Sequence, residues 1–167
     1  MDFDMFELFS ADHLNLRALV AEETFEPVVI RDLSMHLAAE TRLLYPAVER
    51  YLDGGDDITT QLRHDDHQLE ELLATLESDG PSPDNIDHLR AMVERHVDAQ
   101  EVVFPEAKQW IPDHELARLG QEVSRTIREA PTHPHPHLPD HGFLEPAADA
   151  IASTIDHLRD HHHHDDQ

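Results

Sequence analysis

The sequence predicts an all-α protein, an up-down-up-down four-helix bundle with an additional short helix and a His/Pro-rich C-terminal tail. Apolar residues recur at helical spacing through residues 1–130, and no run of alternating β-branched residues interrupts them. Glycines, prolines and acidic residues divide this pattern into four long segments joined by short connections. Long amphipathic helices with short loops are typical of an antiparallel bundle, so we expect residues 1–130 to form the folded unit.

The first two helices are predicted at about residues 4–20 and 23–52. Pro27 falls in the first turn of the second helix, where a missing N–H group is tolerated. Pro46 falls in its interior, so we expect the helix to kink or restart there. The apolar stripe of the first helix includes a histidine and consists of Phe6, Phe9, His13, Leu16 and Leu19 or Val20.

Turn-forming residues separate the remaining helices. Gly54-Gly55 ends the second helix, and Asp56-Asp57 can cap a third helix at about residues 58–78. A turn rich in glycine and proline follows, and Ser82 is the expected N-cap of a fourth helix that continues to about residue 110. Residues 111–113 then break the pattern and cap a shorter fifth helix, which ends near residue 130.

The composition of the chain excludes several classes of partner and site. Its 167 residues include 12 Lys+Arg and 36 Asp+Glu, which gives a formal net charge of −24. We therefore expect no nucleic acid and no membrane surface as partner, because phosphate binding requires clustered cations. The absence of cysteine excludes disulfides, thiolate metal sites and cysteine nucleophiles. No apolar run has the length of a membrane span, and the N-terminus lacks the basic region of a secretory signal, so we expect a cytoplasmic protein. We further expect a monomer or a weak homodimer.

Residues 131–167 differ in composition from the bundle and are predicted as a second unit. Proline at alternate positions in residues 131–139 prevents helix formation and predicts a stiff, extended connector. The histidines at 161–164 indicate a disordered end with incidental chelation, with a metal-scavenging tract or an engineered tag as alternatives. Between them, a short amphipathic helix is predicted from about residue 145, with the apolar stripe Leu144, Ala148, Ile151, Ile155 and Leu158.

Seven of the 16 histidines lie in residues 1–130, and five of them fall on the predicted inward faces of the four long helices. On the second and third helices the spacing is i,i+4 and i,i+3, which puts each pair on one face. On the fourth helix His96 and Glu101 are about 140° apart on an ideal helix, so this pair needs a local bulge or long side chains. The expected metal ligands are His13, His36, Glu40, His64, His67, His96 and Glu101.

These five imidazoles and two carboxylates suit iron, manganese or zinc. Bundle cores are a known place for two-metal carboxylate sites. Glu40 and Glu101 can each give one oxygen to each of two metals, whereas an imidazole can only be a terminal ligand. Any one of the histidines alone could be a hydrogen-bonded core residue, but their joint placement on four helices favours a bound metal pair.

Two segments carry a resemblance to a known family. His36-Leu-Ala-Ala-Glu40 with the following Tyr45-Pro46, and the related segment from His96 to Phe104-Pro105, resemble the signature of the hemerythrin-like, or HHE cation-binding, domain. Asp12-His13 and Asp66-His67 also match it, and the matches follow the family order over about residues 5–120. The connector and short C-terminal helix are similar to actinobacterial members. The resemblance implies two iron ions in an oxygen-bridged, non-haem di-iron centre that handles oxygen, peroxide or nitric oxide.

The sequence departs from the family pattern at several ligand positions. Thr41 stands where family members often carry a second glutamate, and Gln100 occupies the i+4 position after the histidine of the fourth helix. The resemblance implies Glu101 as the ligand on this helix, with Gln100 as the alternative register. Arg63 stands where the family has a further histidine, so His64 is either a ligand or a neighbour of the ligands.

Three classes of function remain open from the sequence. The first is a di-iron protein that carries, senses or consumes O₂, peroxide or nitric oxide, which includes a possible peroxide- or nitric-oxide-consuming enzyme. The second is a metal buffer or storage protein that uses the bundle site and the His-rich tail. The third is an interaction module whose histidines are structural. A histidine-rich site with an open position favours the first class, because it suits reversible oxygen binding or peroxide chemistry.

Overall fold

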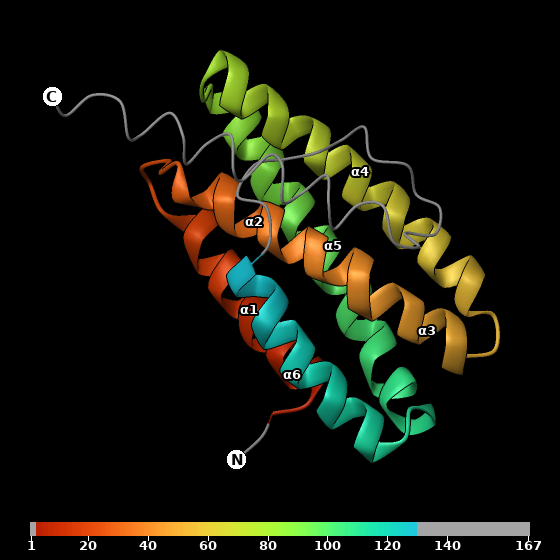
Figure 1. The fold of residues 1–167 in the computed structure, drawn as a ribbon. Coiled ribbons are helices and arrows are strands. Elements are labelled where there is room, and N and C mark those ends of the chain that lie inside the picture. The colour runs from red at the N-terminus through yellow and green to blue at the C-terminus, as the bar shows by residue number, and fades with distance from the viewer. Residues whose placement is uncertain (1–2, 130–167) are drawn as a thin grey trace, which may run out of the picture. The chain divides into compact units, whose positions relative to one another are not determined.

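The computed structural model describes residues 3–129, which are helical apart from short connections, with no strand among them. The helices are, in chain order, α1 (Met5–Ala21), α2 (Val28–Ala39), the π-helical turn η1 (Glu40–Leu44), α3 (Tyr45–Tyr51), α4 (Gly55–Asp79), α5 (Pro83–Trp110) and α6 (Asp113–Glu129). Because α2, η1 and α3 follow one another without a break, they act as one long helix. The bundle therefore consists of α1, the α2–η1–α3 unit, α4 and α5 (Figure 1).

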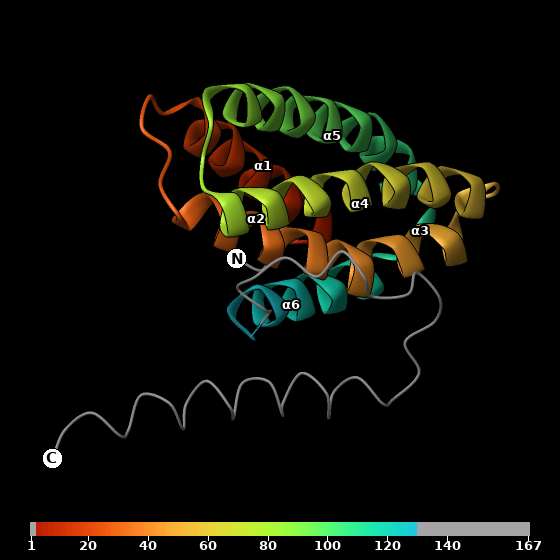
Figure 2. The same cartoon turned by 90° about the horizontal axis from the view of Figure 1, so that it is seen from above.

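The additional helix α6 packs along α1 and α2, on the side of α2 away from α5 (Figure 2). This arrangement confirms the predicted all-α four-helix bundle with a further short helix. The predicted unit 131–167, with its connector, amphipathic helix and histidine tract, lies outside the described residues and stays a prediction. None of the helices within residues 3–129 combines the length and the apolar character that crossing a membrane requires.

Local sequence signals set the ends of the helices. Asp4 and Glu7 form a capping box at the start of α1, where each side chain accepts the other residue's backbone N–H at 3.0 Å. Ser82 caps α5 as expected, with its hydroxyl accepting the N–H of Asn85 at 3.2 Å. The connection before α4 passes through Gly54, whose φ of 73° favours glycine, and α4 begins directly after it.

Two apolar clusters fill the bundle, one toward each end. The first, which we call the α6-end cluster, combines the start of α1, the α3 region and the end of α5 with α6, and includes Phe6, Phe9, Leu44 and Phe104. The second, the loop-end cluster, combines the rest of α1 with α2, the later part of α4 and the start of α5, and includes Leu16, Leu33, Leu73 and Val93. Along α1, α2 and α5, His13, His36 and His96 lie where one cluster gives way to the other. A polar layer therefore separates the two apolar parts of the core.

The interruption expected near Pro46 is present as the π-helical turn η1. The N–H of Tyr45 donates to the carbonyl of Glu40, five residues earlier, and Pro46 falls in the first turn of α3. A π turn adds one residue to a helical turn and is frequently found at functional sites. Here it brings Glu40 and Tyr45, which are both fully buried, to the same side of the helix.

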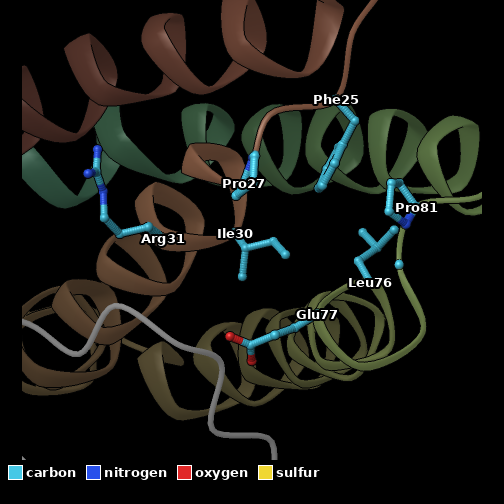
Figure 3. A pocket seen from close by; sticks show the side chains of 8 residues that line it. Phe25, Pro27, Ile30, Arg31, Leu76, Glu77 and Pro81 are labelled. Atoms are coloured by element: carbon cyan, nitrogen blue, oxygen red, sulfur yellow. The ribbon is translucent and has the colours of Figure 1, made fainter. Parts of the chain in front are cut away.

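One pocket of about 480 Å³ opens at the loop end of the bundle, between the start of α2 and the end of α4 (Figure 3). It is lined by Phe25, Pro27, Ile30, Arg31, Leu76, Glu77, Gly80 and Pro81. None of these residues belongs to the polar layer, so the pocket is a feature separate from the histidines.

Candidate metal centre

Three imidazoles and one carboxylate converge in the polar layer, and we call His13, His36, Glu40 and His96 the histidine cluster. One ligand atom from each lies within 4.8 Å of all the others, and all four side chains are buried. Glu40 Oε1 is 2.7 Å from Nε2 of His36, 3.3 Å from Nε2 of His96 and 3.9 Å from Nε2 of His13. The Nε2 atoms of His36 and His96 are 3.3 Å apart. The cluster thus gathers four donor atoms from α1, α2, η1 and α5 around one point.

Each imidazole of the cluster also faces a carboxylate on its other side. The Nδ1 contacts are His13 with Glu101 at 2.7 Å, His36 with Asp12 at 2.8 Å and His96 with Asp66 at 3.0 Å. Because a carboxylate without a proton can only accept, we assign the ring proton to Nδ1 in all three histidines. This assignment leaves the Nε2 lone pairs directed into the cluster, an arrangement typical of metal-binding histidines.

The donor set fits a metal cation. Lone pairs of two imidazoles at 3.3 Å repel each other unless a proton or a cation lies between them. Among the described residues, no group completes a well-oriented hydrogen bond to His13 Nε2 or to Glu40 Oε1, although both atoms are buried. One ion bound by the four donors would satisfy these atoms and balance the buried charge of Glu40.

Without a metal, the electrostatics of the cluster favour bound protons. Burial by itself lowers the pKa of His36, but the charge of Glu40 and the hydrogen bond with Asp12 outweigh it and raise that pKa to about 9. The same competition, with Asp66 as the hydrogen-bond partner, raises the pKa of His96 to about 10. Burial raises the pKa of Glu40, yet the two facing histidines hold it well below its ordinary value. Protons thus take the place of the cation in the metal-free protein.

A second polar group lies on the other side of Glu40, and we call Tyr45, Asp66 and Gln100 the tyrosine network. The hydroxyl of Tyr45 donates to Asp66 and lies 3.3 Å from Glu40 Oε2. The side-chain N–H of Gln100 donates to the same hydroxyl at 3.1 Å. Burial, followed by the charges of Asp66 and Glu40, holds the pKa of Tyr45 well above its ordinary value, so the hydroxyl keeps its proton.

The structure brings together four of the seven predicted ligands, the members of the histidine cluster. Glu101 lies beside them, but its side chain is 38% exposed and accepts hydrogen bonds from His13 and Ser10. On α4, His64 is exposed and His67, which is 43% exposed, lies 3.5 Å from Glu71 on the outer surface. The structure therefore does not place these three side chains as cluster donors, and their predicted ligand role stays untested.

Helix geometry explains these placements. Successive residues of an α-helix point about 100° apart, so Asp66, which faces the cluster, turns its neighbour His67 away. Likewise Gln100, four residues after His96, is fully buried, and Glu101 is turned toward the surface. The outer partners Asp12 and Asp66 were not predicted. The apolar stripe of α4, which consists of Leu62, Leu69 and Leu73, could have identified Asp66 as the inward residue.

Comparisons with known proteins agree with this geometry. The family model described as the hemerythrin HHE cation binding domain matches residues 4–107, more than half of the chain. An uncharacterized hemerythrin-like protein of Schizosaccharomyces pombe is 26% identical over 159 residues, which cover 90% of this chain and 78% of that protein. No solved structure matches the chain. The matched region contains all four residues of the histidine cluster. Because the family model covers more than half of its length, the chain belongs to the hemerythrin HHE cation-binding domain family.

Proposed function

We infer that this protein is a non-haem iron protein that binds or reacts with a small ligand such as O₂, peroxide or nitric oxide. The observation that carries this proposal is the convergence of three imidazole nitrogens and the Glu40 carboxylate in a buried layer. Membership of a cation-binding family supports it. The family resemblance implies an oxygen-bridged pair of irons, and the histidine cluster supplies the donors for one ion.

The residues around the cluster prepare it for a metal and a small ligand. The outer carboxylates hold the imidazoles in one tautomer and one orientation, which reduces the ordering needed when a cation binds. Burial of the cluster between two apolar clusters excludes bulk water and large substrates. His13, His36, Glu40 and His96 would hold the iron, which would supply the site for binding a diatomic molecule or peroxide. The Tyr45 hydroxyl holds a proton next to Glu40 Oε2, on the side away from the histidines.

A metal buffer or storage protein is the second candidate. The nine histidines after Pro131 favour it, since histidine-rich segments bind divalent ions. A buffer must release its ion readily, whereas the buried and anchored donors of the cluster favour retention. Extended dialysis against a weak chelator separates the two functions, because a buffer should lose its iron and the proposed iron centre should keep it.

The test is an anaerobic titration of the purified chain with ferrous iron, followed by O₂, peroxide or nitric oxide in separate samples. We expect near-ultraviolet and visible charge-transfer bands that appear with at least one of these ligands. The His36→Ala variant should lose the bands, because it removes a cluster donor, whereas His67→Ala should keep them. Bands of equal intensity in wild type and His36→Ala would place the reactive iron elsewhere and contradict the proposal.

A further inference from the structure

We propose that the bundle holds one metal ion per chain and that the tyrosine network occupies the place where the donors of a second ion would stand. This inference rests on the proposed function, since it concerns the number of ions that the histidine cluster and its neighbours bind. It departs from the metal pair that the sequence predicted.

The first support is the register of the two related segments. His36 with Glu40, and His96 with Gln100, have the same i,i+4 spacing, and all four side chains are buried. Gln100 therefore stands in α5 where Glu40 stands at the end of α2. A neutral amide cannot supply the second negative charge or bridge two cations as a carboxylate does. Of these four residues, only Glu40 provides a carboxylate to the centre. Glu101, the next acidic residue on α5, accepts hydrogen bonds from His13 and Ser10 instead.

The second support is that α4 supplies no imidazole donor. His64 and His67 lie on its outer surface, and the inward residue is Asp66. One oxygen of Asp66 lies 3.0 Å from Nδ1 of His96, and the other accepts the hydroxyl proton of Tyr45. Asp66 therefore contacts two neighbours, and its Oδ1, which lies beside His96, completes no well-oriented hydrogen bond.

The third support is the hydrogen-bond pattern around Tyr45. Its hydroxyl donates to Asp66 and accepts from Gln100, so its proton and a lone pair are both used. A second ion here would have to displace that proton and break both hydrogen bonds in a buried site, where unpaired polar groups are costly. The same hydroxyl lies 3.3 Å from Glu40 Oε2, so Tyr45 already occupies the space beside that oxygen.

The fourth support is a contact that holds the Tyr45 ring in place. The guanidinium carbon of Arg63 lies 4.8 Å from the centre of that ring, and its side chain is only 16% exposed. Glu49 accepts from this guanidinium at 2.9 Å and fixes its position. The ring is thus held from the side of Arg63 while its hydroxyl is bonded to Asp66, which resists displacement of Tyr45 by an ion.

The experiment counts iron in the full chain by difference, so that any iron bound by the histidines after Pro131 cancels. Wild type and a His36→Ala/His96→Ala variant are loaded anaerobically with ferrous iron, washed with a weak chelator, and measured by elemental analysis and native mass spectrometry. We expect wild type to retain one more iron per chain than the variant. A difference of two overturns the inference and leaves the proposed function intact. A difference of zero overturns the proposed function as well, so the two failures are distinguishable.

Two further measurements keep the test decisive if the double variant does not fold, which circular dichroism reports. The His64→Ala/His67→Ala variant removes the outer histidines of α4 and should keep the wild-type count, whereas loss of one iron shows that a second ion uses them. After oxidation, an isolated high-spin ferric ion gives a low-field EPR signal, whereas an oxygen-bridged ferric pair is magnetically coupled and silent. We expect the low-field EPR signal to integrate to about one spin per retained iron. An iron-loaded protein that gives no EPR signal after oxidation would contradict the inference.

Discussion

Asp12 lies outside the histidine cluster but determines how one of its members is presented. Its carboxylate is 2.8 Å from Nδ1 of His36, the ring nitrogen that faces away from Glu40. Removal of such an outer partner typically weakens metal affinity by about 10–100-fold. We expect this loss for Asp12→Ala in a chelator competition assay. The Asp65→Ala variant is the matched control, since Asp65 contacts Gln61 on the outer side of α4, and an equal loss in both variants would contradict the assignment.

The raised pKa values of His36 and His96 predict how the stability of the metal-free protein depends on pH. A raised folded-state pKa contributes stability that is fully present below the unfolded value of about 6.5 and is lost as pH rises through about 9 and about 10. The lowered pKa of Glu40 acts oppositely, with stability that is lost as pH falls below its ordinary range. Melting temperatures of the chelator-treated protein should therefore fall between pH 7 and 10.

The metal-loaded protein should show the reverse dependence. Coordination requires neutral imidazoles, so protons compete with the metal and the ion is lost as pH falls. Its melting temperature should hold between pH 7 and 10, where the metal-free protein weakens. Parallel declines of the two forms over this range would show that the cluster histidines do not control the difference.

At the scale of elements, the π turn η1 is the device that puts Glu40 and Tyr45 on one side of a helix. In a regular α-helix, residues five apart would diverge by about 140°. Deletion of Thr41, an exposed residue of η1, leaves Glu40 and Tyr45 four residues apart, about 40° on a regular α-helix, so the turn should become regular while both side chains stay on one side. Insertion of one alanine after Thr41 instead places them six residues apart and should separate them, with a stability loss of about 1–3 kcal/mol from unpaired buried polar groups, measured by urea unfolding. The deletion should be much less destabilising than the insertion, and equal stability of the two variants would argue against this role.

Gly120 shows how α6 approaches the rest of the bundle. A Cβ atom at this position would lie 2.4 Å from the backbone oxygen of Phe3, so α6 passes directly over the chain before α1. Gly→Ala in a helix interior ordinarily stabilises by about 1 kcal/mol. We expect Gly120→Ala to destabilise the protein instead, because the added Cβ would force the backbone at Phe3 or in α6 to move. Its melting temperature should be lower than that of wild type. Gln121→Ala, at an exposed neighbouring position, is the control, and a stabilised Gly120→Ala would mean that α6 does not pack so closely.

At the scale of the whole molecule, metal removal should lower stability. An ion that binds only the folded chain stabilises it by about 2.7 kcal/mol at 100 times its dissociation constant. Calorimetric melting with added ferrous iron, and then with a strong chelator, should show this shift in wild type and in His67→Ala. The shift should be absent from His36→Ala/His96→Ala, and its persistence there would assign the effect to the tail.

The four-helix architecture could be predicted from the sequence, because apolar residues at helical spacing mark the buried face of each helix. The apolar stripe of the first helix and the i,i+4 spacing on the second predicted that His13, His36 and Glu40 face inward, and the structure places them together; their role as metal ligands stays a prediction. The sequence predicted His67 as the inward residue from the Asp66-His67 motif, which does not specify which of two adjacent residues faces the core; the structure buries Asp66. The i,i+5 pair implied by the family resemblance likewise favoured Glu101, whereas helical register makes Gln100 the buried residue.

The polar layer also bears on how cooperatively the bundle unfolds. Helices α1 and α5 pass through both apolar clusters, but direct apolar contact is interrupted at the level of the three histidines. Regions of a protein can open separately when little free energy links them. A cation bound by the histidine cluster would tie α1, α2 and α5 together at this level and so link the two ends of the core. Whether the bundle melts as one unit or opens first from one end therefore depends on whether the ion is bound.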